Sequence, residues 1–497
     1  MPGSIFWSPH LTSAFHVDRI LCTTLTISFR SIVAHIQTIE PHLDRLGMWS
    51  LITTAVLAGF ATVQAVLIPR MQTDQGVPRT SSSPSSFMNS VGYGPKWLYW
   101  CQDAAVTEES LRADVRGMAA VYSSGLEVLL FASYGQEPTQ DPTVYGYGSD
   151  AARRVFDILT IEAARNDLTV DFALGPNQGS GIPVENPDQE GFNTELVFTT
   201  LLLKANQSVE NVSLPAFPAP GSIATFAGLA VPYNVTTARM VAALLSDAPD
   251  EFNVTAGNIV LDRNSTAEVF DSVDQVDRTV TVPSSPVDRL LSVFYSRRNG
   301  YPEAKAGFNG TIPGQPGSYG SWVVDHFSPA GAQRSWEFNT EYLVERASVE
   351  LAQAGAFAWE DSPEYRATVF WTEAFPERFK VKFGYDVALA LPAVYTGPKS
   401  FDGANLPKVT LAYADNAINA RYTHYYSSLL SDLYINYIQE QNRLTEQNGL
   451  TYSAQPSSGQ AVDVLGAAAH DGVPECESLA GVTVKDGRAF VGGPHMN

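Results

Sequence analysis

Residues 357–365, FAWEDSPEY, place three carboxyl groups within a short stretch: Glu360, Asp361 and Glu364. The stretch lies where an apolar run ends and a helical pattern begins. Ser362 is a preferred N-cap and Pro363 suits the first helical position, so an acidic residue at 364 is also explained by a helix start. Capping does not explain Glu360 and Asp361. A carboxylate at the end of an apolar strand must be paired, solvated or functional.

A second acidic cluster, PECES, contains Glu475 and Glu477 and follows a later apolar run. Glycoside hydrolysis needs two carboxyl groups across one site, an acid for the leaving oxygen and a base or nucleophile. The two clusters together therefore predict acid–base chemistry on a sugar. The alternative for PECES alone is an ordinary acidic loop.

Other polar residues follow apolar runs in the same way. Asn177 and Gln178, in GPNQGSG, are candidates for hydrogen bonds to sugar hydroxyls; this loop lacks the lysine of a phosphate loop. Asp325 and His326 are further substrate-binding candidates, although an adjacent Asp–His pair is more often structural. Glu360 and Glu475 are also candidates for substrate binding, and Asp361 is a candidate for catalysis. Trp359 is suited to stacking on a sugar, and equally to a core.

The elements that must position these residues alternate between strands and helices. Strands are predicted at 96–100, 126–134, 168–174, 321–327, 356–362, 449–455 and 471–478, with helices at 107–125, 149–167, 329–354, 363–383 and 414–448. Ser149 is a plausible N-cap. This pattern predicts an α/β fold of the TIM (β/α)8 type, whose site lies at the carboxyl ends of the strands. GxGxxG and GxxxxGK[ST] loops are absent, so we expect no nucleotide cofactor.

Composition narrows the partners. The 497 residues carry a net charge of −21, with 44% hydrophobic and 17% charged residues. Such a chain can bury a large core, and its charge argues against nucleic acid or an anionic membrane surface. The cysteines are Cys22, Cys101 and Cys476; one bridge between Cys101 and Cys476 is possible, and buried thiols are the alternative. The sequence sets no oligomeric state.

The N-terminal part predicts secretion. Residues 48–65 have the pattern of a signal peptide that follows Arg45 and ends in small residues, and 66–95 form a Ser/Pro/Gly linker. Residues 1–47 are expected to be a spurious or unstructured extension. The alternative is a membrane-anchored surface protein, because residues 48–69 carry no charge and are long enough to span a bilayer.

Residues 192–300 interrupt the alternation with short β-rich runs separated by turn residues, which predicts an inserted β-rich region. Most of the chain's N-glycosylation sequons fall there, as expected for an exposed part of a secreted protein. The sequon asparagines are Asn206, Asn211, Asn234, Asn253, Asn264 and Asn309.

The motifs WLYW, GLEVLLFASYG, VDFALGPNQGSG, WVVDHFSPAGA, AFAWEDSPE, TYSAQP and PECESL occur in this order between residues 96 and 480. In order and spacing they resemble secreted fungal proteins similar to glycoside hydrolase family 106, the α-L-rhamnosidases. The resemblance implies a TIM-barrel domain that hydrolyses terminal rhamnose from plant glycans with inversion and with the help of calcium. It places no calcium ligand.

The resemblance also assigns roles. Its DSxE element matches Asp361, Ser362 and Glu364, which makes Glu364 the expected catalytic acid, and Glu477 matches the later acidic element as base or transition-state stabiliser. The barrel would comprise 96–191 and 301–480. Residues 481–497 depart from the family, and its eighth strand is missing. We therefore expect an incomplete barrel from a truncated chain; a carbohydrate-binding pseudoenzyme is the alternative.

Overall fold

The computed structural model describes part of the 497-residue chain, all of it from residue 94 onward. The described residues are 94–101, 104–130, 141–176, 181–184, 188–206, 209–217, 223–225, 228–230, 238–249, 257–298, 321–344, 348–363, 367–395, 409–456 and 460–475. The chain divides into two units, Met1–Ser83 and Pro84–Asn497, and every described residue belongs to the second. The predicted extension, signal peptide and C-terminal tail lie outside the described residues.

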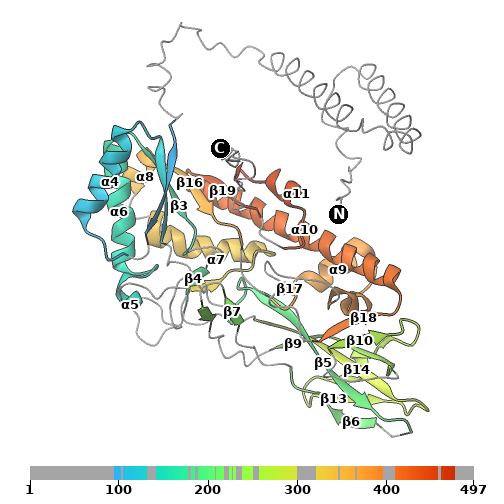
Figure 1. Ribbon diagram of the computed structural model, residues 1–497. Coiled ribbons are helices and arrows are strands. Elements are labelled where there is room, and N and C mark those ends of the chain that lie inside the picture. Colours follow the sequence, from blue (N-terminus) through green and yellow to red (C-terminus); the bar gives the residue numbers. More distant parts are fainter. Residues whose placement is uncertain are drawn as a thin grey trace, which may run out of the picture. The chain divides into compact units, whose positions relative to one another are not determined.

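The described fold contains a six-stranded parallel sheet (Figure 1). Each strand pairs in parallel with the next in the order β1-β2-β3-β16-β19-β20. The strands are β1 Lys96–Cys101, β2 Gly125–Leu130, β3 Thr169–Ala173, β16 Gly355–Glu360, β19 Thr451–Ala454 and β20 Val473–Pro474. Six of the seven strands predicted for a barrel therefore lie side by side in chain order.

The remaining predicted strand does not belong to this sheet. Residues 321–327 were expected between β3 and β16, but β15, Ser321–Val323, pairs antiparallel with β4, Gly181–Pro183. β3 instead hydrogen-bonds directly to β16. Within the described residues no pairing joins β1 to β20, and the fold that they form is a mixed α/β structure with a parallel sheet.

Two helices between the first strands cover one face of the sheet. They are α4, Glu108–Ala120, and α6, Asp150–Arg165; the short α5 spans Pro142–Tyr145. Thr107 caps α4, and Ser149 caps α6 as predicted, its hydroxyl accepting from the backbone N–H of Ala152. Each cap satisfies a backbone donor and contributes about 1 kcal/mol.

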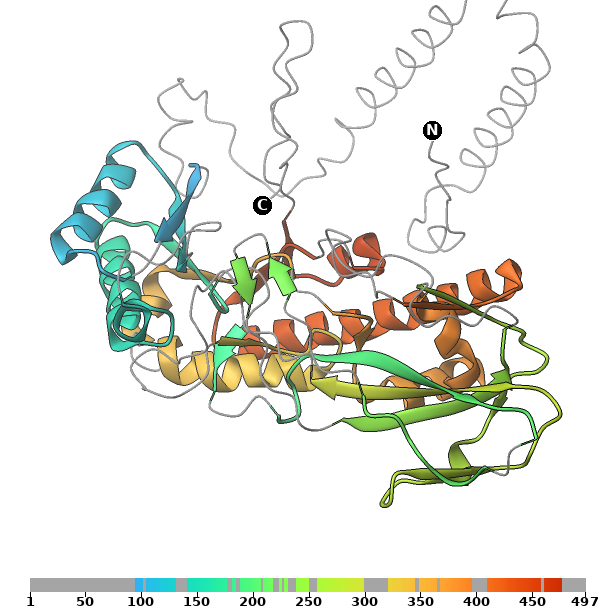
Figure 2. The ribbon, with the colours of Figure 1, turned by 60° about the horizontal axis from the view of Figure 1, so that its bottom comes forward.

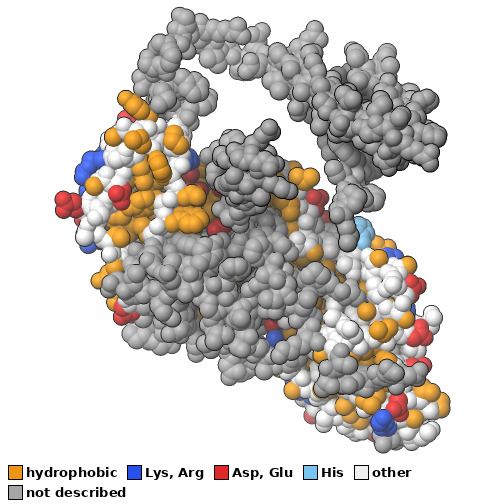
Figure 3. Space-filling view, in the orientation of Figure 1, with side chains coloured by type: hydrophobic (Ala, Val, Ile, Leu, Met, Phe, Trp, Pro, Cys, Tyr) orange, Lys and Arg blue, Asp and Glu red, His pale blue; other side chains and the backbone are white. Residues whose placement is uncertain are grey.

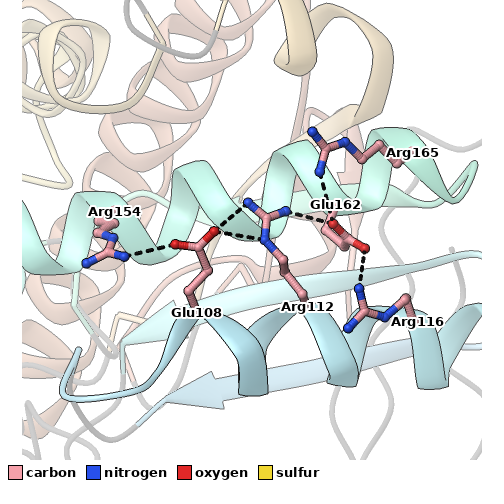
Figure 4. A network of polar contacts seen from close by, with 6 residues as sticks. All are labelled: Glu108, Arg112, Arg116, Arg154, Glu162 and Arg165. Atoms are coloured by element: carbon pink, nitrogen blue, oxygen red, sulfur yellow. Dashed lines mark hydrogen bonds and ion pairs between the residues drawn. The ribbon is translucent and has the colours of Figure 1, made fainter.

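A charged network links α4 to α6 (Figure 4). Arg112 donates to Glu162 at 2.7 Å, and Arg116 reaches the same carboxylate at 3.2 Å. Arg112 also pairs with Glu108, four residues earlier on α4. Burial is the largest single effect and raises the pKa of Glu162, but the guanidinium groups of Arg112, Arg116 and Arg165 together outweigh it and hold that pKa below its ordinary value. These contacts fix the two helices against each other.

The later helices pack on the same sheet. Ser328 caps α7, Pro329–Asn339, which runs into a π-helical turn at Thr340–Val344 (η6); α8 follows at Ser348–Ala354. The helix predicted over 329–354 is thus helical in all its described residues, with a π-helical turn at Thr340–Val344; residues 345–347 lie outside them. The helix predicted over 414–448 is α10, Asn416–Gln447, which lies along α7 in Figures 1 and 2. α11 spans Val464–Ala468.

Among the described residues, the predicted helix over 363–383 is wrong for residue 363 and for residues 367–374. Phe370–Trp371 form β17, which pairs antiparallel with β5, and the helix α9 spans only Phe375–Phe383. Pairing with a distant strand overrides the local helical pattern. A 3₁₀ segment, η7, follows at Ala388–Tyr395 and is almost wholly buried.

The β-rich region forms several antiparallel sheets. In the largest, ordered β11-β9-β14-β5-β17, the long strands lie side by side (Figure 2). Its members are β5 Thr194–Leu203, β9 Arg239–Asp247, β11 Ala267–Glu268 and β14 Arg289–Arg298, besides β17. The remaining elements are β6 Val209–Ser213, β7 Ile223–Thr225, β8 Gly228–Ala230, β10 Asn258–Leu261, η4 Phe270–Ser272, β12 Val273–Asp274, β13 Thr279–Val282 and β18 Thr410–Tyr413.

The large antiparallel sheet is buried on both faces. One face packs on the main core through residues such as Leu290 and Phe294, and the other forms a second core with β6 and β13 that includes Val293 and Val280. Each such side chain contributes about 1.5–3 kcal/mol by its burial. Because β17 and β18 follow residue 300, the β-rich sheets also contain strands from the later part of the chain.

The described sequon asparagines are exposed. Asn206, Asn211 and Asn264 lie on the surface, the first two in left-handed backbone conformation with φ of 58° and 53°. Asn234, Asn253 and Asn309 lie outside the described residues, so glycosylation stays a prediction. In the described part of the chain, no helix combines the length and apolarity needed to cross a membrane; residues 48–69 are outside that part.

Candidate functional site

The parallel sheet has two faces of different chemistry. Leu126, Val128 and Leu130 of β2 point into the main core with the helices, whereas Leu129 belongs to a separate small cluster with Ala173 and Trp359. Strand side chains alternate between faces, so Glu127 lies on the same face as Leu129, and Asp171 on the same face as Ala173. We call this face, marked by Glu127, Leu129, Asp171, Ala173 and Trp359, the inner face.

Four carboxyl groups gather on the inner face. Glu127 and Asp171 are register partners on β2 and β3, Asp361 directly follows β16, and Glu475 directly follows β20. All four residues are buried. We call Glu127, Asp171, Asp361 and Glu475 the carboxylate cluster.

Glu475 is held by the strands next to it. Its Oε2 accepts a hydrogen bond from Trp359 Nε1 at 2.9 Å, and its Oε1 accepts one from Ser453 Oγ at 2.7 Å. Its backbone N–H continues the ladder to Ala454. The indole of Trp359 thus reaches across β19 and joins the end of β16 to the end of β20, so the two acidic motifs lie at one edge of the sheet.

Asp361 is the acidic residue of the DSPE motif that the structure describes. Its Oδ1 accepts from the backbone N–H of Ser362 at 2.7 Å, and the side chain is buried beside the cluster. Glu364 and Glu477, the expected acid and base, lie outside the described residues, as do Asn177 and Gln178. Ser362 starts no helix at Pro363 within the described residues.

Asp171 is paired. Lys96 Nζ donates to its Oδ2 at 2.6 Å, and the backbone N–H of Phe357 donates to its Oδ1 at 3.2 Å. The Lys96 ammonium also lies 4.1 Å from the centroid of the Phe357 ring. Burial raises the pKa of Asp171 to about 6, although Lys96 opposes this shift.

Glu127 differs from its neighbours. Glu127 is 5% exposed, and its Oε1 has no hydrogen-bond partner in the described structure. Burial is the largest cause that raises the pKa of its carboxyl group to about 9, and the nearby charges of Glu475, Asp171 and Asp361 add to it. At neutral pH Glu127 is therefore an uncharged acid.

Glu360 lies on the opposite, helix-facing side. Its Oε1 accepts from Tyr437 of α10 at 2.8 Å and lies 2.8 Å from His326 Nε2, while its Oε2 accepts from the hydroxyl of Tyr452. Gln441 donates to the Tyr437 hydroxyl. Glu360 and His326 thus belong to a polar network that joins the sheet to α10. Their substrate-binding role stays a prediction, and the geometry offers a structural role beside it.

Asp325 is fully buried close to that network. Thr372 Oγ1 donates to its Oδ2 at 2.7 Å, and the backbone N–H of Phe327 donates to its Oδ1 at 2.9 Å. Burial raises the pKa of Asp325 to about 6, against the effect of these two donors. The loop is tight, because a Cβ added at Gly331 would lie 2.1 Å from the Asp325 carbonyl oxygen.

The described residues offer no ready calcium site. Among them, no group of three or more His, Cys, Asp or Glu side chains is arranged to hold a metal ion. The cluster itself fits a cation poorly, because Lys96 already neutralises Asp171 and two donors occupy the oxygens of Glu475. Cys101 is buried in β1, and Cys476 lies outside the described residues.

Sequence reasoning missed Lys96, Glu127 and Asp171. A signal was present: an acidic residue within each of the continuous apolar runs LEVLLF and TVDFAL, where a buried strand rarely tolerates one. On the inner face, β1 carries Leu98 and Trp100, which are 48% and 38% exposed. Figure 3 shows hydrophobic side chains at the surface in this part of the molecule.

Comparison with solved structures shows a structural likeness. The chain is similar to the solved structure of a rhamnosidase from Novosphingobium sp. PP1Y, with a TM-score of 0.47 and 16% sequence identity, over 76% of this chain and 47% of that one. The chain thus spans about half the length of that protein. No family model matches the sequence, and no curated protein does.

Proposed function

We propose that the chain is a secreted glycoside hydrolase that removes a terminal sugar, α-L-rhamnose, from plant glycans by acid–base catalysis. The observation that carries this proposal is that the two acidic motifs lie close together. Asp361 and Glu475 border the same edge of the inner face, and Trp359 donates a hydrogen bond to Glu475. Carboxyl groups converging at the carboxyl ends of parallel strands suit the two-carboxyl chemistry of glycoside hydrolysis.

In this proposal the parallel strands are part of a (β/α)8-type barrel, and Glu364 and Glu477 are the catalytic pair. Glu364 follows Pro363 and protonates the leaving oxygen; Glu477 activates water or stabilises the transition state. Inversion requires these two carboxyl groups about 6.5–9.5 Å apart, with room for a water molecule. Asp361 and Glu475 contribute negative charge next to the sugar ring, where positive charge develops.

The test uses leaving groups of different acidity. The full chain is assayed on 4-nitrophenyl α-L-rhamnoside and on a rhamnose-terminated oligosaccharide. 4-Nitrophenolate leaves without protonation, so Glu364→Gln should lose about 10²–10⁴-fold in kcat on the oligosaccharide and much less on the aryl glycoside. Glu477→Gln should lose about equally on both. Glu109→Gln, an exposed change on α4, is the matched control.

Two results would overturn the proposal. A wild-type chain that hydrolyses neither substrate would exclude the activity, and glycan binding without turnover, unchanged in Glu364→Gln, would favour a carbohydrate-binding pseudoenzyme instead. Equal losses of Glu364→Gln on both substrates would reject Glu364 as the acid. The anomer released first, followed by proton NMR, decides between inversion and retention.

A further inference from the structure

Glu127 is the buried acid for which the proposed mechanism has no use. It lies in the middle of β2 in register with Leu98 on one side and Asp171 on the other, and it is 5% exposed. Native proteins rarely leave a buried carboxyl oxygen without a hydrogen-bond partner, and each such case needs a reason. The Oε1 of Glu127 is one such oxygen in the described structure.

The donors around Glu127 are engaged elsewhere. Lys96 Nζ and the backbone N–H of Phe357 both donate to Asp171, while Trp359 and Ser453 both donate to Glu475. A charged carboxylate without a donor would be costly in this position, whereas the uncharged acid is tolerated. An uncharged carboxyl group both donates and accepts a hydrogen bond, which is what a sugar hydroxyl needs from its partner.

The groups that face Glu127 come from four elements. Lys96 lies on β1, Asp171 on β3, Asp361 after β16 and Glu475 after β20, and the three acids are the charges that most raise the pKa of Glu127 beyond the effect of burial. Strand alternation places the Glu127 side chain on the inner face with these groups, and not in the helix-facing core. Small buried side chains, Ala173 and Ser453, lie on the same face between Glu127 and the edge of the sheet where Asp361 and Glu475 lie.

We propose that Glu127 binds a hydroxyl group of the sugar held at the carboxylate cluster, and that it is a specificity-determining residue of this site. The proposal rests on the proposed function for the identity of the sugar. The ligand supplies the missing partner of Oε1, and a sugar that lacks this hydroxyl leaves the buried acid unsatisfied. Such a loss discriminates more strongly than the loss of an apolar contact.

The test measures binding separately from hydrolysis. L-Rhamnose and its monodeoxy derivatives are titrated calorimetrically into the full chain carrying Glu127, Glu127→Gln or Glu127→Leu. The amide of Gln also donates and accepts, so we expect its affinity for L-rhamnose within about threefold of wild type. Leu is similar in size but forms no hydrogen bond, so we expect a loss of about tenfold. Melting temperatures confirm that each variant is folded.

The deoxy sugars identify the hydroxyl. One derivative should bind the wild type about tenfold more weakly than L-rhamnose does, yet bind Glu127→Leu as well as L-rhamnose does, because the contact is then absent from both. The other derivatives should be weakened equally by the Leu substitution. This coupling between one hydroxyl and one side chain is not expected if Glu127 only fills space.

The other possible outcomes also support or overturn the proposed role of Glu127. Unchanged L-rhamnose binding in Glu127→Leu, or an equal loss for every deoxy sugar, would overturn the proposal. A large fall of kcat in Glu127→Gln with unchanged binding would make Glu127 a proton donor instead. Absence of hydrolysis in the wild type with the expected binding pattern would overturn the proposed function and support the role of Glu127; a wild type that binds none of these sugars would overturn both.

Discussion

Replacement of Glu127 by Gln should stabilise the protein, and by an amount that grows with pH. Gln has nearly the shape of the protonated acid and cannot ionise. Burial, and then the charges of Glu475, Asp171 and Asp361, raise the pKa of Glu127 from 4.5 to about 9 in the folded state. In the unfolded state the group titrates near its ordinary value.

The sign follows from proton binding. Between the unfolded and the folded pKa, the folded protein holds a proton on Glu127 that the unfolded chain has lost, so the free energy of unfolding falls as pH rises. The slope for one proton is about 1.4 kcal/mol per pH unit. Between about pH 5 and pH 8 the wild type should lose about 4 kcal/mol relative to Glu127→Gln, and the difference should stop growing above the folded pKa of about 9.

The assay is urea unfolding of both proteins at a series of pH values, followed by tryptophan fluorescence. Other groups, including Asp171 with its own raised pKa, titrate alike in both proteins and cancel in the difference. An unchanged m-value would show that the compactness of the two end states is the same. Glu109→Gln removes an exposed carboxyl group of α4, and its difference from wild type should be flat with pH.

Parallel stability curves for wild type and Glu127→Gln would refute the reasoning. They would mean that Glu127 ionises in the folded protein as it does in the unfolded chain, through solvent or a donor not accounted for by its contacts. A difference that increases as pH falls would refute it more strongly, because it would require a carboxylate stabilised by the fold. Neither result would bear on the roles of Glu364 and Glu477.

Three substitutions away from the carboxylate cluster test individual contacts of the fold by the free energy of unfolding in urea. Arg297→Met should cost about 3–5 kcal/mol, because the buried carboxylate of Glu195, which accepts from Arg297 at 2.7 and 3.0 Å, loses its charged partner. Gly331→Ala should cost more than about 2 kcal/mol, since its Cβ would lie 2.1 Å from the Asp325 carbonyl oxygen, and a change below 0.5 kcal/mol would contradict this contact. Thr107→Ala should cost about 1 kcal/mol through the lost cap of α4, with Thr107→Ser as the control that keeps it.

The double substitution of Glu195 and Arg297 separates two explanations of the first of these results. If the cost of Arg297→Met comes from an unpaired buried charge, the further change Glu195→Leu should recover much of it. A double variant as unstable as the sum of the single changes would show instead that the arginine acts by packing. The two residues are direct cross-strand partners on β5 and β14, and Glu195 also accepts from the backbone N–H of Thr368 at 2.7 Å.

The sequence predicts the parallel strands and the long helices well, because their signals are local. The continuous apolar run of β2 and the amphipathic pattern of α10 each fix an element from its own residues. Residues 321–323 and 370–371 were placed wrongly for the opposite reason. Their runs are short, and distant partners decide their pairing: β4 takes the first, β5 the second. No local pattern contains that information.

The candidate site, too, could be predicted from local sequence only in part. Adjacent residues Glu360 and Asp361 look equivalent in sequence, yet strand alternation sends them to opposite faces, one into the network with Tyr437 and the other to the carboxylate cluster. The position of a strand end could be predicted, but not which face each acid occupies. That depends on where the ladder between β16 and β19 ends, at the hydrogen bond from Gln455 to the Glu360 carbonyl.

Glu127 shows why the unexpected residues matter most. An apolar side chain in its place would lower the cost of burial and leave no oxygen unsatisfied, so its presence in β2 works against stability. Lys96 could have neutralised it but pairs with Asp171 instead. A chain that keeps an uncompensated acid beside three others loses stability that a ligand can restore on binding. Glu127→Leu should therefore both stabilise the sugar-free protein and weaken its affinity for the sugar. If Glu127→Leu only stabilised the protein, the effects of Glu127 on folding and on sugar binding would be separate.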